Sequence, residues 1–68
     1  MKKIKITTEY ITLGQFLKFV GIITNGSEAK SYLMDNLVYV NEEKEDRRGR
    51  KLYPTYKVKT NNEEFLVE

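Results

Sequence analysis

The chain has 68 residues, enough for one domain, with 12 basic and 10 acidic residues and a net charge of +2. It contains no cysteine and no histidine, which excludes disulfide bridges and the usual zinc sites. A net charge this small does not by itself indicate a nucleic-acid ligand, so the distribution of charge has to decide. We expect a single cytoplasmic domain over residues 1–68, monomeric, with no signal peptide and no membrane span.

The first third of the chain predicts a strand followed by a helix. Residues 3–8 alternate polar and apolar side chains, which indicates a short strand with both isoleucines on one face. Thr12 and Gln15 have the spacing of a capping box, and apolar residues follow at helical spacing. Gly21 suits the left-handed conformation that ends many helices, so we expect this helix to end there.

A second helix is predicted to begin near Thr24 or Asn25. Asn25 and Glu28 again have the spacing of a capping box. Asn36 marks the predicted end, because asparagine tolerates the left-handed cap. The expected buried face of this helix consists of Ala29, Tyr32, Leu33 and Leu37.

After the second helix the apolar period changes from helical to two. Residues 38–40 predict a strand, and Asn41-Glu42 is placed to open a turn. Residues 56–60 and 63–67 alternate on either side of Asn61-Asn62, which predicts a hairpin because asparagine accepts positive φ. The order of elements indicates an α+β fold, with a short helix pair packed on a small twisted, mostly antiparallel sheet.

Catalysis is difficult to build from these residue types. Without histidine or cysteine, a nucleophile and its base would have to come from serine, threonine, lysine or a carboxylate. Ser27 and Ser31 fall in the second helix, where capping and solvent exposure explain them. The acidic residues between 42 and 46 are interleaved with basic ones and make a poor cation site. We therefore expect no enzyme activity, no metal ion and no cofactor.

The most informative stretch is EDRRGRKL, residues 45–52, where Arg47, Arg48, Arg50 and Lys51 fall within five positions. One interpretation is a solvated loop whose acidic half pairs loosely with its basic half. The other is a surface that binds phosphate. The acids precede the bases, so the bases can form one positive surface, and arginine binds phosphate through two parallel hydrogen bonds.

Other residues could extend this surface. Lys18 and Lys30 lie at helical positions that the apolar pattern assigns to solvent. Tyr53 and Tyr56 flank Pro54 just beyond the basic run. These two tyrosines either pack against the fold or offer a stacking face to an unpaired base.

These motifs resemble the RNA-binding domain named after ribosomal protein S-four. The resemblance extends from about residue 12 to residue 58 and rests on Leu13-x-x-Phe16-Leu17-Lys18, Gly21-Ile22, Ser27-Glu28-Ala29-Lys30 and Val38-Tyr39-Val40-Asn41. More narrowly, the chain is similar to the small stand-alone YaaA-like proteins of bacteria in Thr24-Asn25-Gly26-x-x-Ala29-Lys30 and in Glu45-x-Arg47-Arg48-Gly49-Arg50-Lys51-Leu52-Tyr53-Pro54. The chain departs from the family pattern at Glu42 and Thr55, where glycine is usual.

The resemblance implies a ribosome-associated module that binds structured RNA, either ribosomal RNA or transfer RNA, in ribosome assembly or translation. In such domains the helix pair and the adjoining loop, the αL RNA-binding motif, contact RNA mainly through phosphates and shape. Carried over by position, the candidate RNA-binding residues are Lys18, Asn25, Gly26, Lys30, Arg47, Arg48, Arg50 and Lys51.

Two other functions remain open at this point. A protein-interaction adaptor would dock an acidic partner on the arginine-rich loop, and its binding would also be sensitive to salt. A DNA-binding module is less favoured, because the exposed helix positions hold few side chains that read base edges. Nuclease treatment of a captured complex separates the RNA and adaptor hypotheses.

Overall fold

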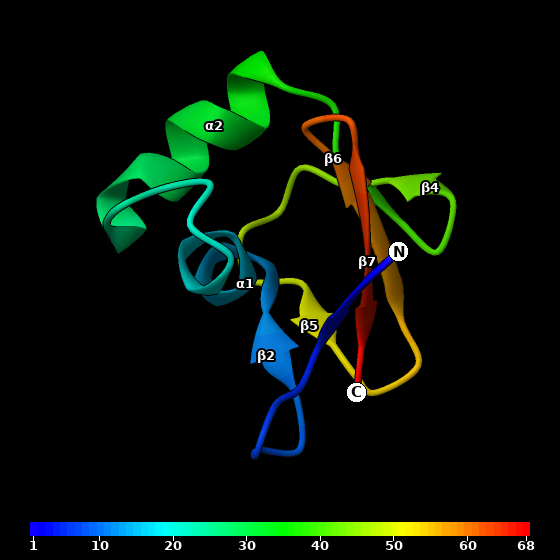
Figure 1. Ribbon diagram of the computed structural model, residues 1–68. Coiled ribbons are helices and arrows are strands. Elements are labelled where there is room, and N and C mark those ends of the chain that lie inside the picture. Colours follow the sequence, from blue (N-terminus) through cyan, green and yellow to red (C-terminus); the bar gives the residue numbers. More distant parts are fainter.

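The computed structural model describes all residues, 1–68, and places a helix pair on one side of a small sheet (Figure 1). The two helices lie together on the left of Figure 1, and the longest strands lie on the right. This arrangement confirms the predicted α+β class. The elements in chain order are β1 (Lys2–Ile4), β2 (Ile11–Thr12), α1 (Leu13–Phe19), the 3-10 helix η1 (Gly26–Glu28), α2 (Ala29–Asp35), β3 (Tyr39–Val40), β4 (Glu43–Lys44), β5 (Lys51–Leu52), β6 (Lys57–Thr60) and β7 (Glu63–Val67).

The strands form two sheets of unequal size. The larger has five strands in the order β1-β7-β6-β3-β4, and the smaller pairs β2 with β5. Only the β1–β7 pair is parallel, and the remaining pairs are antiparallel. The mostly antiparallel sheet that the sequence predicts is therefore confirmed.

The N-terminal strand is shorter than the alternating pattern of residues 3–8 predicts. It covers only Lys2–Ile4, and the ladder ends after the Ile6 amide donates to the Glu68 carbonyl, 2.8 Å away. Residues 7–9 form a bend, so the alternating pattern does not continue as a strand to residue 8. Ile4 and Ile6 are both half-buried against the core, as the period of two predicts.

Helix α1 begins and ends where its local signals predict. The Thr12 hydroxyl accepts from the Gln15 amide, and the Gln15 side chain accepts from the Thr12 amide, which completes the capping box. Gly21 follows the helix with φ of +80°, a conformation that glycine adopts without steric cost.

The second helical segment begins as predicted but ends differently. Asn25 caps a 3-10 turn, with Glu28 completing the capping box, and α2 continues from Ala29. Asn36 is extended, with φ of −134°, so the predicted left-handed cap is wrong. Leu37 is also not buried but 57% exposed, because the helix has already ended and Val38 fills the core position instead.

Two tight hairpins use the positive φ that asparagine tolerates. Asn61-Asn62 connects β6 to β7, with φ of 55° and 58°, as the sequence predicts. Asn41-Glu42 connects β3 to β4, with φ of 50° and 72°. Both residues of each pair lie in the left-handed region that a type I′ turn requires. Thr55 adopts φ of 84°, so a β-branched residue occupies a conformation that favours glycine.

The core lies between the helix pair and the inner face of the sheet. Twelve apolar residues are buried there, and Phe16 of α1 meets Phe65 of β7 edge to face with ring centroids 5.1 Å apart. The one buried hydroxyl, on Thr60, bonds to the Tyr32 hydroxyl at 2.8 Å and to the Leu37 carbonyl at 3.0 Å. Tying α2 to the sheet in this way fixes the helix pair over the core.

Candidate nucleic-acid interface

The segment between β4 and β5 is fastened to the first turn of α1 by backbone hydrogen bonds. The Leu13 amide donates to the Arg50 carbonyl and the Gly14 amide donates to the Arg48 carbonyl, both at 2.8 Å. These amides lie in the first helical turn and have no partner within the helix. The basic loop therefore satisfies them, and in return α1 fixes the position of the loop.

Gly14 allows three segments to meet at this point. A Cβ atom at Gly14 would lie 3.4 Å from the Arg48 carbonyl oxygen and 3.5 Å from the Cβ atoms of Arg48 and Ala29. The loop and the start of α2 therefore both pack against this position of α1. Lys18 is one helical turn after Gly14 on the same face of α1, and Lys30 directly follows Ala29.

Within the loop, the Glu45 carboxylate organises two of the arginines. It is only 6% exposed and accepts five hydrogen bonds. Two come from the amides of Asp46 and Arg47, two from the Arg47 guanidinium at 3.0 and 3.1 Å, and one from the Arg50 guanidinium at 2.7 Å. The Arg47 hydrogen bond is the largest influence that lowers the pKa of Glu45 to about 2, against the opposing effect of burial.

This network corrects the expectation that the four bases of the run form one free positive surface. Arg47 and Arg50 are paired with a buried carboxylate, and the Arg50 side chain is only 25% exposed. Lys51 lies over the Tyr10 ring, with its amino group 4.9 Å from the ring centroid. Arg48 is the exposed arginine of the loop that has no ion pair within the chain.

Several amides at the start of the second helical segment already have partners within the chain. The Thr24 and Asn25 amides both donate to the Glu28 carboxylate, and the Ser27 amide donates to the Asn25 side chain. The Thr24 hydroxyl and the amides of Asn25 and Thr24 hold the pKa of Glu28 below its usual value, so a negative charge already occupies this end. Gly26 is exposed, and no atom would lie within 4 Å of an added Cβ.

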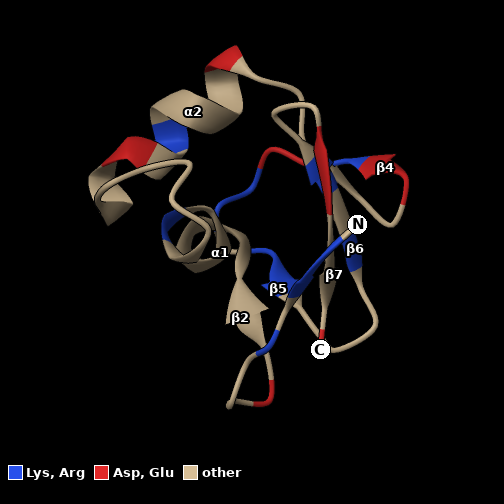
Figure 2. Cartoon of the chain, in the orientation of Figure 1, with Lys and Arg blue, Asp and Glu red and all other residues tan.

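The predicted site residues thus fall into three groups. Lys18, Lys30 and Arg48 are exposed and unpaired around the junction of α1, α2 and the loop, and Figure 2 shows the basic segments of both helices beside the loop that leads to β5. Arg47, Arg50 and Lys51 are engaged with neighbours in the chain. Asn25 and Gly26 lie in a turn that is largely satisfied internally.

Tyr53 and Tyr56 pack within the chain. Their rings are 5.7 Å apart, and Tyr53 lies at the same distance from Tyr10. All three are half-buried. The packing interpretation of Tyr53 and Tyr56 therefore agrees with the structure, and Tyr10 is a member of the cluster that sequence reasoning missed.

Sequence reasoning also missed Gly14 and the role of Glu45. A glycine directly inside a helix start is a local signal that something packs closely there, and it could have been noticed. The burial of Glu45 has no comparable local signal, because it depends on how the loop folds against α1.

No three acidic side chains lie close enough together to hold a metal ion. Neither α1 nor α2 is long and apolar enough to cross a membrane.

Comparison with known proteins agrees with the resemblance drawn from the sequence. The family model of the S4 domain matches residues 4–68. The probable ribosome maturation protein RlbA of Bacillus subtilis (strain 168) is 56% identical over 50 residues, which cover 74% of this chain and 70% of that protein. The chain therefore belongs to the S4 domain family of RNA-binding domains.

Proposed function

We propose that this protein binds structured ribosomal RNA in the cytoplasm as a single non-catalytic domain and takes part in ribosome maturation. The proposal extends to this chain what the name of its relative says of that protein. The surface that we assign to the RNA, called the helix–loop surface below, consists of Lys18, Lys30 and Arg48, with Gly26 of η1 and Lys51 of β5.

The observation that carries the proposal is the exposure of Arg48 on a loop that is itself held rigidly. Two hydrogen bonds of 2.8 Å fix the loop backbone on α1, so the backbone of Arg48, which carries the guanidinium, is held in place. A guanidinium without an acidic partner can donate two parallel hydrogen bonds to a phosphate. Lys18 and Lys30 add two positive charges from the helices beside it.

Arg47 and Arg50 have a different proposed role. Glu45 already accepts hydrogen bonds from both and partly neutralises their charge. Arg47 and Arg50 therefore attract a phosphate less strongly than Arg48 does. We assign to them the folding of the loop into the shape that presents Arg48. Asn25 similarly shapes the turn through its cap, and Gly26 leaves room for a phosphate to approach the backbone.

The proposed function predicts a specific dependence on salt. Each phosphate contact contributes roughly −0.9 to the slope of log affinity against log salt concentration for a duplex. Arg48→Ala is expected to weaken binding to purified ribosomal subunits and to reduce this slope by about 1. The triple change of Lys18, Lys30 and Arg48 to alanine is expected to reduce it by about 3.

Co-sedimentation with purified ribosomal subunits at several salt concentrations measures this dependence. Lys5→Ala is the matched control, because Lys5 is exposed, unpaired and outside the helix–loop surface. Equal slopes for wild type and the triple variant would refute the proposed surface. Retention of the protein in the subunit fractions after nuclease digestion of the RNA would favour the adaptor hypothesis instead.

A further inference from the structure

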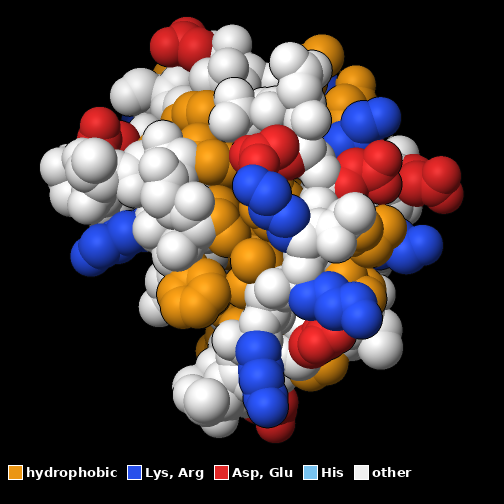
Figure 3. Space-filling view, viewed as in Figure 1, with side chains coloured by type: hydrophobic (Ala, Val, Ile, Leu, Met, Phe, Trp, Pro, Cys, Tyr) orange, Lys and Arg blue, Asp and Glu red, His pale blue; other side chains and the backbone are white.

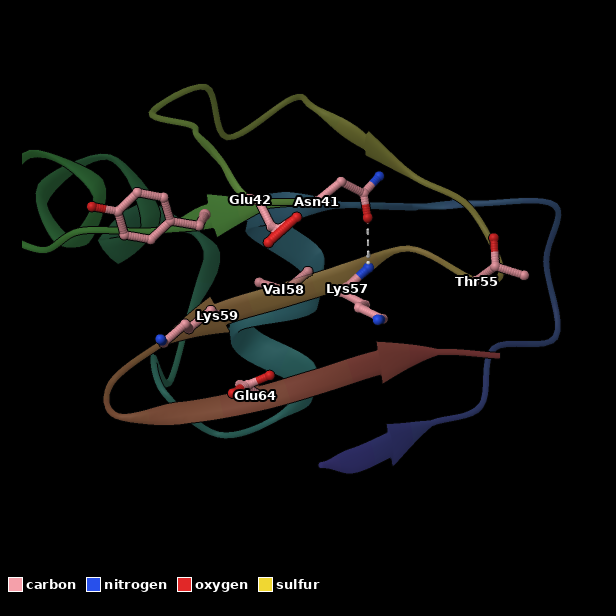
Figure 4. Close-up of a pocket in the computed structure, with 8 residues that line it drawn as sticks. Asn41, Glu42, Thr55, Lys57, Val58, Lys59 and Glu64 are labelled. Atoms are coloured by element: carbon pink, nitrogen blue, oxygen red, sulfur yellow. Dashed lines mark hydrogen bonds between the residues drawn. The ribbon is translucent and has the colours of Figure 1, made fainter.

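The outer face of the five-stranded sheet, turned away from the helices, carries a second set of unpaired basic residues. Along β6, Val58 and Thr60 are buried toward the core, while Lys57 and Lys59 alternate with them and are exposed (Figure 4). The register places Tyr39 of β3 directly opposite Lys59 of β6.

Tyr39 is flanked by lysines on both sides. On the other edge of β3 it pairs with Lys44 of β4, so the cross-strand order is Lys44, Tyr39, Lys59, and Glu64 of β7 lies opposite Lys59 at the end of this row. Directly opposed residues point to the same side of a sheet, with Cβ atoms about 5 Å apart. A half-buried aromatic ring therefore lies between two exposed amino groups on one open face.

Lys44, Lys59 and the Tyr39 hydroxyl form no ion pair or side-chain hydrogen bond within the chain, although Glu64 lies opposite Lys59. Neither Lys44 nor Lys59 takes part in any of the ion pairs, which all lie elsewhere. The Tyr39 hydroxyl makes no hydrogen bond with another side chain or with the backbone, unlike that of Tyr32. On the side of the molecule drawn in Figure 3, basic and acidic side chains lie around a group of hydrophobic side chains.

The surface around Tyr39 is hollowed on both sides. The two depressions of the molecule share Tyr39 and Lys59, and one of them extends toward Asn41 and Lys57 while the other extends toward Asn61. Asparagine side chains carry both donors and acceptors, which suits the edges of a base.

Acidic residues restrict where a polyanion can lie on this face. Glu42 and Glu64 border the first depression, and Asp35 borders the second. A phosphate is repelled from those positions. Because Glu64 lies directly opposite Lys59, the favourable path for a negatively charged chain runs over Lys44 and Tyr39 and ends at Lys59. The balance of charges makes stacking on the ring, rather than charge, the main source of affinity.

We propose that Tyr39, Lys44 and Lys59 form a second RNA site, which binds an unpaired nucleotide. The base stacks on the Tyr39 ring, and the two lysines contact the phosphates on either side of it. Aromatic rings flanked by basic residues on an open sheet bind single strands in this way with little sequence preference. The site shares with the proposed function the premise that the chain binds RNA, but it lies on the opposite face of the sheet from the helix–loop surface.

The test measures binding of a fluorescein-labelled oligouridylate of six nucleotides by anisotropy, beside an abasic oligomer of the same length. Tyr39→Leu is expected to weaken oligouridylate binding about 5- to 150-fold, and Tyr39→Phe to leave it within about twofold, because phenylalanine keeps the stacking face. Wild type is expected to bind the abasic oligomer as weakly as Tyr39→Leu binds the oligouridylate.

A second variant keeps the test decisive if Tyr39→Leu proves unstable. Lys44→Ala with Lys59→Ala changes only exposed side chains and is expected to reduce the salt slope by about 1.4, from two single-strand phosphate contacts. Equal affinity of wild type for the two oligomers, competition by polyglutamate as effective as that by oligouridylate, or an unchanged slope would each overturn the proposal.

The same variants separate this site from the helix–loop surface. Arg48→Ala is expected to bind the oligouridylate like wild type while losing affinity for ribosomal subunits. If Arg48→Ala lowers both and Tyr39→Leu lowers neither, the second site is refuted and the proposed function stands. If Tyr39→Leu lowers oligouridylate binding and Arg48→Ala changes nothing, the role of Arg48 in the helix–loop surface is refuted and the second site stands.

Discussion

Replacing Glu45 with glutamine keeps the shape of the side chain and removes the charge that holds Arg47 and Arg50. The low pKa of Glu45, about 2 against an ordinary value of 4.5, corresponds to at most about 3 kcal/mol of stabilisation. The Arg47 side chain is 72% exposed, so water screens part of this interaction. We therefore expect Glu45→Gln to lower the free energy of unfolding by about 2 kcal/mol at pH 7.

The size of this effect makes it easy to measure. A domain of 68 residues has a free energy of unfolding of roughly 3–10 kcal/mol, and about 2 kcal/mol corresponds to a fall of roughly 8–16 °C in Tm. Urea denaturation followed by circular dichroism gives the free energy of unfolding directly. Glu43→Gln makes the same chemical change at an exposed position of β4 without an ion pair, and we expect it to change stability by less than about 0.5 kcal/mol.

The pH dependence identifies the carboxylate as the cause. Because the pKa of Glu45 is lower in the folded state than in the unfolded state, its stabilisation is complete above about pH 5 and is lost as the pH falls toward 2. The difference in stability between wild type and Glu45→Gln should therefore shrink over this interval. A difference that stays constant down to pH 2, or a glutamine variant as stable as wild type at pH 7, would refute the proposed network.

Glycine should be favoured at the two turn positions that have positive φ: Glu42→Gly and Thr55→Gly are each expected to raise the free energy of unfolding by about 0.5–1 kcal/mol. Thr7→Gly, at an exposed bend without positive φ, should not raise it, and a similar gain there would contradict the conformational explanation. Gly14→Val should cost about 1–3 kcal/mol, since its methyl groups would push against the Arg48 carbonyl and Ala29. Gly26→Val, in open space, should stay within about 0.5 kcal/mol, so equal losses at Gly14 and Gly26 would disprove the close contact.

The features predicted correctly from the sequence are those specified by neighbouring residues. Both capping boxes depend on side chains three positions apart, and both form. The Asn61-Asn62 hairpin likewise follows from the tolerance of asparagine for positive φ. These signals do not depend on how distant parts of the chain pack.

The errors arise where an element depends on a distant partner. The N-terminal strand pairs with β7 only as far as Ile4 and residues 7–9 form a bend, which the alternation of residues 3–8 does not reveal. Leu37 has a helical spacing from Leu33, but the helix stops at Asp35 and Val38 occupies the core. Periodicity predicts a face only for as long as the element continues.

The candidate site shows the same limit. Composition alone identifies the basic run, and the helix pattern correctly assigns Lys18 and Lys30 to solvent. The sequence could not show that Arg47 and Arg50 pair with Glu45 while Arg48 stays unpaired, because that pairing depends on the folded shape of the loop. The loop is thus neither a loosely paired solvated segment nor a uniformly free basic surface.

Crosslinking of the wild-type protein to purified ribosomal subunits, followed by mass spectrometry of the crosslinked peptides, tests the central claim most directly. Ultraviolet light joins RNA to the residues that touch it, so the crosslinked peptides locate the contact without any substitution. We expect crosslinks in the peptides that contain Lys18, Lys30 and Arg48. Crosslinks absent from all three peptides, in a sample where the protein co-sediments with the subunits, would contradict it.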